Sequence, residues 1–460
     1  MKRNVAVLVL DCVRKDFFEE HATRLLRMSD VSVDRYYAAS SWSTPSHASM
    51  FTGELPHRHG VHAHNLDFRN LETDTFLSEL EEHTTVGTST NLFVGPSFGF
   101  DSLFDEFWNA SRNGVFMGGM NIEEFSQESP SGGIRKYRDF VAEAYRRDCL
   151  SRSLLNGASV KLNDAVEAAQ MPRLWDYGAG SMIRGSLGRL PSREPFFFFA
   201  NFMEAHSPYS PSVKYDSSLY NVPRGWSGEA KEWEINKNPD EYIDLVEGRR
   251  EVYAASVDYL DRKVSSFVER LMEMTEGEMT VFVTADHGEN LAFESEDFMW
   301  GHQGSLSHPL LHVPFAAINL PDEHAEALSG LSFSHLDLGD LVVSVAKDEP
   351  VEIQSREYVP AERIGYGPST EPDDFEYWDR AIRCVYHDGS RYEWDSLGGR
   401  YEYEIIGDST EKKVSEDTEI PDEAMEQFDK DIEEYKKKAS GSRAELDDTT
   451  KQNLSELGYL

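Results

Sequence analysis

Ser43 is the residue of this chain whose position best suits a nucleophile. It lies in Trp42–Gly53, WSTPSHASMFTG, two residues before Pro45. Proline is tolerated at the first position of a helix, where its missing N–H costs nothing, so the segment predicts a helix that begins at Pro45. The free amides and positive dipole end of that helix would face the hydroxyl and attract an anion such as a sulfate or phosphate ester. For a serine taken in isolation, a plain helix cap is the commoner role.

Other polar residues with catalytic potential follow runs of apolar residues. They are Asp11 after Val5–Leu10, His206 after Phe196–Phe202, and Asp286 with His287 after Met279–Thr284. A further histidine, His302, lies in a later Gly-His-Gln-Gly segment. Carboxylates with a neighbouring imidazole can hold a divalent cation, and His206 and His302 can donate to a substrate or move a proton. Taken singly, each is more often a cap, turn or loop residue, so only the combination points to a site.

The apolar runs predict strands, because continuous apolar residues fit a strand that is buried on both faces. Between the later two runs lies Tyr253–Leu271, whose apolar residues recur at helical spacing. Buried strands that alternate with helices indicate an α/β fold with a mainly parallel sheet flanked by helices. The polar residues follow the carboxyl ends of the strands, which is where open α/β sheets place their sites.

The sequence pattern changes near residue 345. Ala381–Tyr386 and Tyr401–Ile406 read as short strands, and His387-Asp388-Gly389 is a turn signal. These features predict a small antiparallel subdomain. No elements are predicted for Asn109–Arg193, which is rich in Gly, Ser and Arg.

We therefore expect three parts along the chain. They are an α/β catalytic domain over residues 1–345, a small antiparallel C-terminal subdomain over 346–407, and an acidic, charged helical tail over 408–460. The last helix of the tail is expected to close on apolar residues, namely Leu454, Leu457, Tyr459 and Leu460.

The chain is strongly acidic. It has 460 residues, with 83 Asp and Glu against 45 Lys and Arg, for a net charge of −38. Such a field repels phosphate, so nucleic acid and anionic membrane surfaces are not expected as partners. We favour an adaptation to high salt over an ordinary acidic protein, because salt screens the self-repulsion of such a surface. Hydrophobic residues make up 39% of the chain, which is enough for a packed core.

The cysteines and the N-terminal segment indicate the cellular compartment in which the protein is expected. The three cysteines, Cys12, Cys149 and Cys384, have no metal-ligand spacing and are too few for a disulfide framework. The first apolar run is too short for a signal peptide, and no stretch approaches the length of a membrane span. The expectation is a cytoplasmic protein, with the oligomeric state left open.

Several motifs in order along the chain resemble the sulfatase branch of the alkaline phosphatase superfamily. They are the Asp11 strand, Ser43-Thr44-Pro45-Ser46 with Thr52-Gly53, His206-Ser207-Pro208-Tyr209, Asp286-His287-Gly288, Gly301-His302, His312-Val313-Pro314 and the closing Leu457-Gly458-Tyr459-Leu460. The resemblance implies an alkaline phosphatase-like fold. It also implies a metal-dependent hydrolase of sulfate esters whose substrate is a small molecule or a glycan.

The resemblance further implies roles for particular residues. One divalent metal would be held by Asp11, Asp286 and His287, with calcium expected and manganese or zinc as alternatives. Ser43 would attack the ester, either unmodified or after conversion to formylglycine. His206 and His302 would take part in catalysis. Substrate binding is assigned to three residues, His47, His59 and Asn91.

The chain departs from the family pattern at four places. Cys12 stands where many members carry a second Asp, and His47 stands where they usually carry Arg. A lysine expected near Asn91 is absent, and Gln303 occupies the place of a second lysine. Two alternatives therefore stay open. One is a phosphodiesterase or phosphonate monoester hydrolase with unmodified Ser43, and the other is a non-catalytic binding protein that retains the fold.

Overall fold

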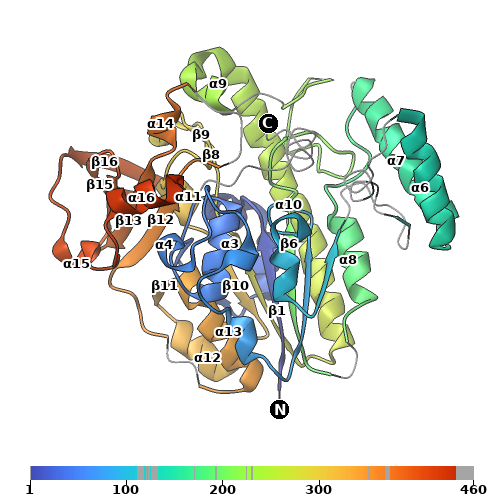
Figure 1. Ribbon diagram of the computed structural model, residues 1–460, viewed down its shortest axis with the longest axis horizontal. Coiled ribbons are helices and arrows are strands. Elements are labelled where there is room, and N and C mark those ends of the chain that lie inside the picture. The colour runs from blue at the N-terminus through green and yellow to red at the C-terminus, as the bar shows by residue number, and fades with distance from the viewer. Residues whose placement is uncertain are drawn as a thin grey trace.

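The computed structural model describes most of the chain (Figure 1). It covers residues 2–441 apart from 111–118, 121, 123–124, 126–132, 170, 192–193, 224, 229–231, 351–352 and 368–372. The helix expected near Leu454 lies outside the described residues. Among the described residues, no helix is long and apolar enough to cross a membrane.

A seven-stranded sheet forms the centre of the fold, with strand order β2-β10-β7-β1-β6-β4-β5. Its strands are β1 (Asn4–Leu10), β2 (Val31–Ser32), β4 (Thr84–Ser89), β5 (Glu106–Asn109), β6 (Phe196–Phe202), β7 (Met279–Thr284) and β10 (Phe315–Ile318). The five strands from β7 to β5 in this order pair in parallel, whereas β10 pairs antiparallel with β7 and β2. The α/β fold with a mainly parallel sheet is confirmed, and the three expected central strands are β1, β6 and β7.

The register of the central strands brings their carboxyl ends level. Val9 of β1 pairs with Asn201 of β6 on one side and with Thr284 of β7 on the other. Asp11 and Asp286 each follow their strand within two residues. The residues expected to form a site therefore leave the sheet at one edge.

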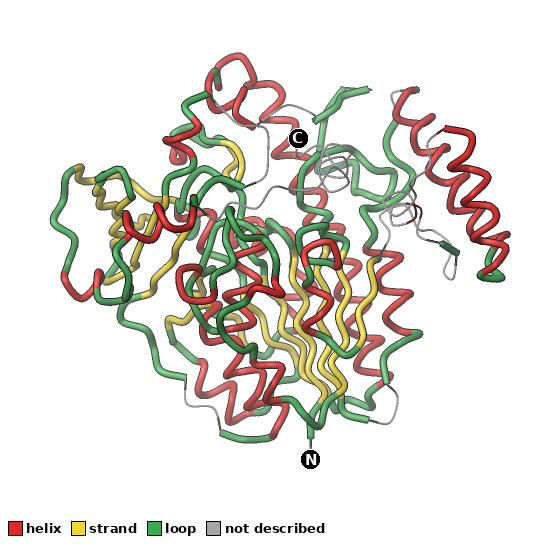
Figure 2. Tube along the Cα trace, in the orientation of Figure 1, coloured by secondary structure: helices red, strands yellow, loops and turns green. Residues whose placement is uncertain are grey.

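Helices cover both faces of the sheet, as Figure 2 shows. One group packs around α10 (Ile243–Met274) and comprises α1 (Lys15–His21), α2 (Thr23–Met28) and α8 (Ala179–Leu187). A second group comprises α3 (Ser43–Thr52), α4 (Pro56–His59) and α13 (Leu338–Lys347). The helix expected over Tyr253–Leu271 lies within α10.

Helix α3 begins at Ser43, two residues earlier than the expected start at Pro45. The residue before it, Trp42, is extended, and its side chain does not cap the helix. The first helical N–H groups all lack an intrahelical partner, so proline is as acceptable at the third position as at the first. Ser43 is thus the first residue inside the helix and not its cap. The helix ends at Thr52 and is followed by Gly53, whose φ of 70° favours glycine.

A second, antiparallel sheet has the order β12-β13-β14-β15-β16. Its strands are β12 (Val359–Ile364), β13 (Ala381–His387), β14 (Ser390–Asp395), β15 (Arg400–Gly407) and β16 (Thr410–Glu416). The expected turn joins β13 to β14, with φ of 46° at Asp388 and 82° at Gly389. The helices α15 (Asp422–Met425) and α16 (Ile432–Ser440) follow.

Strand β16 corrects part of the expected organisation. Residues 408–460 were expected to be a helical tail, but β16 pairs with β15 and so extends the sheet past residue 407. Its sequence, TEKKVSE, is nearly all polar, and four of its seven residues are exposed. Charged edge strands of this kind avoid pairing with other chains, and they lack the apolar alternation that marks a half-buried strand.

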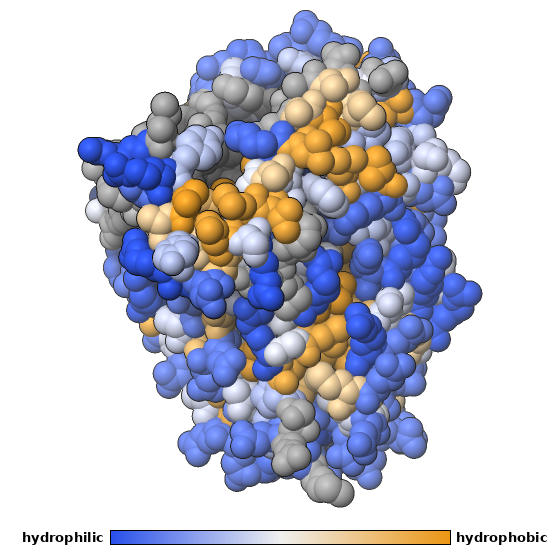
Figure 3. Space-filling view, turned by 90° about the vertical axis from the view of Figure 1, so that its right-hand side faces the viewer, coloured by the Kyte–Doolittle hydropathy of each residue, from blue (hydrophilic) through white to orange (hydrophobic). Residues whose placement is uncertain are grey.

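Two helices form a hairpin at one side of the molecule (Figure 1). They are α6 (Gly133–Arg146) and α7 (Leu150–Ala168), in the segment for which no elements were predicted. Figure 3 shows hydrophobic side chains on the face that carries these helices. Exposed apolar residues of the hairpin include Tyr137, Val141, Tyr145, Leu154, Leu155 and Leu162.

Several further short strands and helices belong to the described structure. The strands are β3 (Arg35–Tyr37), β8 (Asn290–Leu291), β9 (Trp300–Gly301) and β11 (Ser332–Ser334). The helices are α9 (Glu232–Lys237), α11 (His308–Leu311), α12 (Asp322–Leu328) and α14 (Phe375–Trp378).

Candidate active site

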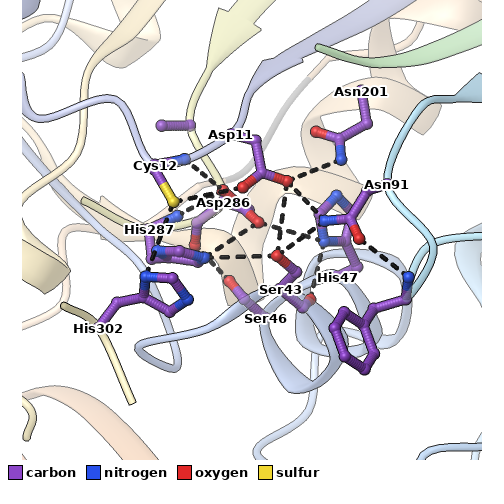
Figure 4. Close-up of polar contacts among 12 residues, drawn as sticks. Asp11, Cys12, Ser43, Ser46, His47, Asn91, Asn201, Asp286, His287 and His302 are labelled. Carbon is purple, nitrogen blue, oxygen red and sulfur yellow. Dashed lines mark hydrogen bonds and ion pairs between the residues drawn. The ribbon is translucent and has the colours of Figure 1, made fainter. Parts of the chain in front are cut away.

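Asp11, Asp286, His287 and Ser43 converge at the carboxyl edge of the central sheet (Figure 4). The Oγ atom of Ser43 lies 3.5 Å from Asp11 Oδ2 and 3.4 Å from His287 Nε2. Asp11 and Asp286 follow the adjacent strands β1 and β7, and Ser43 comes from the start of α3. Three separate elements thus bring a hydroxyl, two carboxylates and an imidazole into contact.

Two amides hold Asp11 in its charged form. Asn91 Nδ2 and Asn201 Nδ2 both donate to Asp11 Oδ2, at 2.8 and 2.9 Å. Burial alone would raise the pKa of Asp11, but His206, His287 and the two amides together lower it to about 2. Asn91 Nδ2 also donates to Ser43 Oγ at 3.0 Å, so one amide orients both the carboxylate and the hydroxyl.

Asp286 is less well compensated than Asp11. Its Oδ1 accepts from the backbone N–H groups of Cys12 and His287, at 3.2 and 3.0 Å. Its Oδ2 is buried without a hydrogen-bond partner. The imidazole nitrogens His287 Nε2 and His47 Nδ1 lie 3.4 and 3.7 Å from this oxygen. Burial and the nearby charge of Asp11 raise the pKa of Asp286 well above its usual value. Such a pair of carboxylates calls for a cation between them.

The residues predicted as metal ligands fit that cation. One donor atom each from Asp11, Asp286 and His287 lies within 4.8 Å of the others, and all three residues are buried. Burial lowers the pKa of His287 to about 3, which keeps the ring neutral, as a metal ligand must be. His287 Nδ1 lies 2.8 Å from the Gly288 carbonyl oxygen, so Nε2 is the atom that faces the carboxylates.

The His302 ring packs beside the His287 ring, with 4.5 Å between ring centres. Its Nδ1 lies 3.0 Å from Glu289 Oε1, and Tyr209 OH donates to Glu289 Oε2 at 2.8 Å. Burial would lower the pKa of His302, but the Glu289 carboxylate raises it to about 9. The His206 ring lies 5.5 Å from that of His302, and burial lowers the pKa of His206.

His47 and His59 have different places. His47 lies one turn along α3, where its Nδ1 is 2.8 Å from the Ser43 carbonyl oxygen and its Nε2 has no hydrogen-bond partner. Burial lowers the pKa of His47 to about 4, so it is neutral near pH 7. His59 lies apart from this group, because its ring nitrogens meet Ser49 Oγ and the Val61 N–H, both at 3.1 Å. The structure therefore does not bring His59 together with the other predicted residues.

Three residues of the site were not predicted from the sequence. Asn201 is the one polar residue of the strand FFFFANF, and a lone amide in a run of buried apolar residues was a usable signal. Glu289 directly follows the Asp286-His287-Gly288 motif. Tyr209 stood within a quoted motif without a role. Asn201 contacts Asp11, Glu289 contacts His302 and Tyr209 contacts Glu289, and these contacts between separate segments are not revealed by local sequence.

Comparison of the sequence with protein-family profiles identifies the family to which this chain belongs. The profile described as Sulfatase matches residues 20–340, which is more than half of the chain. The chain belongs to the sulfatase family. The match includes Ser43, Asp286, His287 and His302, whereas Asp11 precedes it. Family membership supports the predicted enzyme class, a hydrolase of sulfate esters.

Solved structures share the fold. A phosphonate monoester hydrolase from Silicibacter pomeroyi aligns with a TM-score of 0.58 at 14% identity, covering 88% of this chain and 89% of that one. BT4656, solved with its substrate D-glucosamine-2-N,6-O-disulfate, aligns with a TM-score of 0.54 at 10% identity over 88% and 91%. The phosphonate monoester hydrolase of Agrobacterium radiobacter gives 0.53 at 12% identity over 88% and 89%. No protein of curated function matches the sequence. At these identities the likeness establishes the fold.

Proposed function

We propose that this sulfatase hydrolyses sulfate esters by attack of Ser43, or of a formylglycine derived from it, beside one divalent cation. The observation that carries the proposal is the meeting of Ser43 Oγ with Asp11 Oδ2 and His287 Nε2, at 3.5 and 3.4 Å. A hydroxyl in contact with two metal-ligand candidates is the arrangement that activates a nucleophile.

Asp11, Asp286 and His287 would hold the cation. Once bound, it would lower the pKa of the nucleophile and neutralise the negative oxygens of the ester. The fit rests on the unpartnered Oδ2 of Asp286, which is buried next to a second carboxylate. The ester's organic portion is expected to be a small molecule or a glycan.

The protein groups divide the remaining work. Asn91 orients the hydroxyl through its 3.0 Å hydrogen bond to Ser43 Oγ. The positive dipole end of α3, which begins at Ser43, favours an anion there. His302 holds a proton at neutral pH, because its pKa is raised to about 9, and can give it to the oxygen that leaves as the S–O bond breaks. Water would then hydrolyse a serine sulfate, whereas a sulfated formylglycine hydrate would expel sulfate to give the aldehyde, which water hydrates again.

A phosphodiesterase or phosphonate monoester hydrolase with unmodified Ser43 is the second candidate. The observation that favours it is His47, which replaces the usual Arg of the segment around the modified residue. Because the pKa of His47 falls to about 4, that position supplies no positive charge near pH 7.

Mass measurement and substitution test the proposal together. Ser43→Ala should keep α3, since the Ser43 side chain does not cap it, and should lower turnover of aryl sulfate by at least about 1,000-fold. Thr52→Ala removes another hydroxyl from the same helix, one bonded to the Ala48 carbonyl at 2.7 Å, and should leave turnover within a few-fold. Mass across the Ser43 peptide shows whether two hydrogens are lost on conversion to formylglycine.

The outcomes separate the candidates. Turnover of aryl sulfate that depends on Ser43 supports the sulfatase, with the mass deciding which nucleophile acts. Preference for aryl phosphodiesters or phosphonates with unmodified Ser43 supports the second candidate. Activity of Ser43→Ala within a few-fold of the parent would overturn Ser43 as nucleophile, and bound metal without turnover of any ester would indicate a binding protein.

A further inference from the structure

Cys12 occupies an unusual place beside the predicted metal site. It directly follows Asp11, is fully buried, and has a φ of 63°, a conformation that side chains other than Gly, Asn and Asp rarely adopt. Its backbone is fixed on both sides, because its N–H donates to Asp286 Oδ1 at 3.2 Å and its carbonyl accepts from Tyr253 OH at 2.7 Å. The fold thus holds the thiol in one direction.

That direction points into the cluster of ligand candidates (Figure 4). Cys12 Sγ lies 3.4 Å from Asp11 Oδ1 and 3.8 Å from His302 Nδ1. It belongs to two groups whose donor atoms lie within 4.8 Å of one another, one with His287 and His302 and one with Asp11 and His206. Ligands about 2.0–2.3 Å from a tetrahedral ion stand roughly 3.5 Å apart, so these separations need little adjustment.

A second observation points to a bound cation at the same place. Asp286 Oδ2 is buried without a hydrogen-bond partner, although Asp286 Oδ1 is fully engaged by the N–H groups of Cys12 and His287. A buried carboxylate oxygen without a partner is costly, and a metal ion supplies one. The open oxygen lies 3.4 Å from His287 Nε2, and the thiol shares a group of candidate ligands with the same histidine.

We propose that Cys12 is itself a metal ligand and that it makes this site selective for a thiophilic ion such as zinc over calcium. The inference rests on the metal site of the proposed function. Calcium takes six to eight oxygen ligands, whereas zinc favours four ligands drawn from thiolate, imidazole and carboxylate. Here the thiol shares one group of candidate ligands with Asp11 and His206 and another with His287 and His302, and such mixed sets of sulfur, nitrogen and oxygen suit zinc. His302 is not needed as a ligand, because its Nδ1 is held by Glu289.

Cobalt substitution reads out the sulfur directly. The full chain, stripped of metal with a chelator, is titrated with Co²⁺, which takes zinc sites and gives a near-ultraviolet charge-transfer band only when sulfur is a ligand. We expect this band in the parent protein, its loss in Cys12→Ser, and its retention in Cys384→Ser. Cys384 is the matched control, because it is equally buried but lies in β13 of the other sheet. Absence of the band in the parent, or its survival in Cys12→Ser, would overturn the proposal.

Competition between metals tests the selectivity. The parent, dialysed against equimolar Zn²⁺ and Ca²⁺, should retain zinc, as measured by elemental analysis. Cys12→Asp should weaken zinc binding by more than about 10-fold, the least expected when even a supporting residue of a metal site is lost. This variant should fold, because aspartate tolerates a positive φ better than most residues. Retention of calcium and not zinc by the parent would contradict the proposal.

Asp286→Asn separates failure of this inference from failure of the proposed function. If Asp286→Asn abolishes cobalt binding and Cys12→Ser leaves it unchanged, the metal site stands and the thiol ligand is wrong. If the band depends on both residues but the zinc-loaded protein hydrolyses no ester, the ligand set stands and the hydrolase is wrong.

Discussion

Two buried carboxylates of this chain, Glu362 and Asp286, differ in their hydrogen-bond partners and in the direction of their pKa shifts. Glu362 of β12 accepts from Arg383 Nε at 2.7 Å and from His57 N and Nδ1 at 2.7 and 2.8 Å. Burial would raise the pKa of Glu362, but His57 and Arg383 lower it to about 2. Asp286 is just as buried, yet one of its oxygens has no partner and its pKa is raised well above the usual value.

The difference shows what distinguishes a site from a structural ion pair. Both carboxylates lie fully inside the protein, so burial alone marks neither as functional. Glu362 is neutralised by the guanidinium of Arg383, so this cluster needs no bound metal ion. At Asp286 the adjacent groups are Asp11 and neutral histidines, so Asp286 is the carboxylate that the cation we propose would compensate.

The largest expected effect comes from removing the uncompensated charge. Asp286→Asn should weaken metal binding by more than about 100-fold, because loss of a direct ligand should exceed the loss of a supporting residue, and turnover should fall with it. The fold should be as stable as the parent or more so, since a repulsion with Asp11 disappears. Metal content, ester hydrolysis and thermal melting measure the three quantities. Full metal occupancy in the variant would remove Asp286 from the site.

For the cluster of Glu362, Arg383 and His57 we expect a loss of stability without a loss of metal binding or turnover. Arg383→Met leaves Glu362 buried without its main cation, which should lower the free energy of unfolding by about 3–5 kcal/mol. Metal content and turnover per folded molecule should stay unchanged. Denaturant unfolding and elemental analysis test this pair of expectations.

A double variant is the control for the Arg383 experiment. Arg383→Met with Glu362→Gln removes both charges, and should recover part of the lost stability. A single variant as stable as the parent would show that His57 alone compensates Glu362.

The sequence predicted the central architecture and most of the residues that meet at the candidate site, and the reasons are local. Val5–Leu10, Phe196–Phe202 and Met279–Thr284 could be recognised as strands because each is continuously apolar. Their polar followers then fell at one edge of the sheet by topology alone. Helix start, by contrast, was misjudged at Pro45, because proline fits several positions of the first turn.

What the sequence could not supply were contacts between distant segments. Asn201 orients Asp11, and Glu289 sets the charge of His302, through side chains that meet only when the strands pair. Strand β16 was not predicted from the sequence, because its charged residues show no alternation with apolar ones. The place of His59 depended on how α4 packs against α3. Each of these is a tertiary property.

Acid unfolding offers a finer test of the comparison. The pKa of Glu362 is about 2 when folded against an ordinary 4.5, so its contribution is present above pH 4.5 and is lost as the pH falls toward 2. We expect the stability difference between parent and Glu362→Gln, about 3 kcal/mol at neutral pH, to vanish over this range. Denaturant unfolding at a series of pH values measures it. A difference independent of pH would mean that the charge of Glu362 is not what stabilises the cluster.

The smallest expected effect is that of salt on the melting temperature. Salt should act on the exposed acidic surface and leave the buried Asp286 and Glu362 clusters almost unaffected. The chain carries a net charge of −38, and raising KCl from 0.01 to 1 M shortens the Debye length from about 30 to about 3 Å, which screens repulsion between exposed charges but affects buried pairs little. Each 1 kcal/mol gained should raise the melting temperature of a 460-residue chain by about 1 °C. If the acidic surface is an adaptation to high salt, the rise should have the same size in the parent, in Asp286→Asn and in Arg383→Met, because all three share that surface. A melting temperature that is flat or falls with KCl would count against the adaptation. A rise confined to the parent and Asp286→Asn would instead place the salt-sensitive repulsion at the Glu362 cluster.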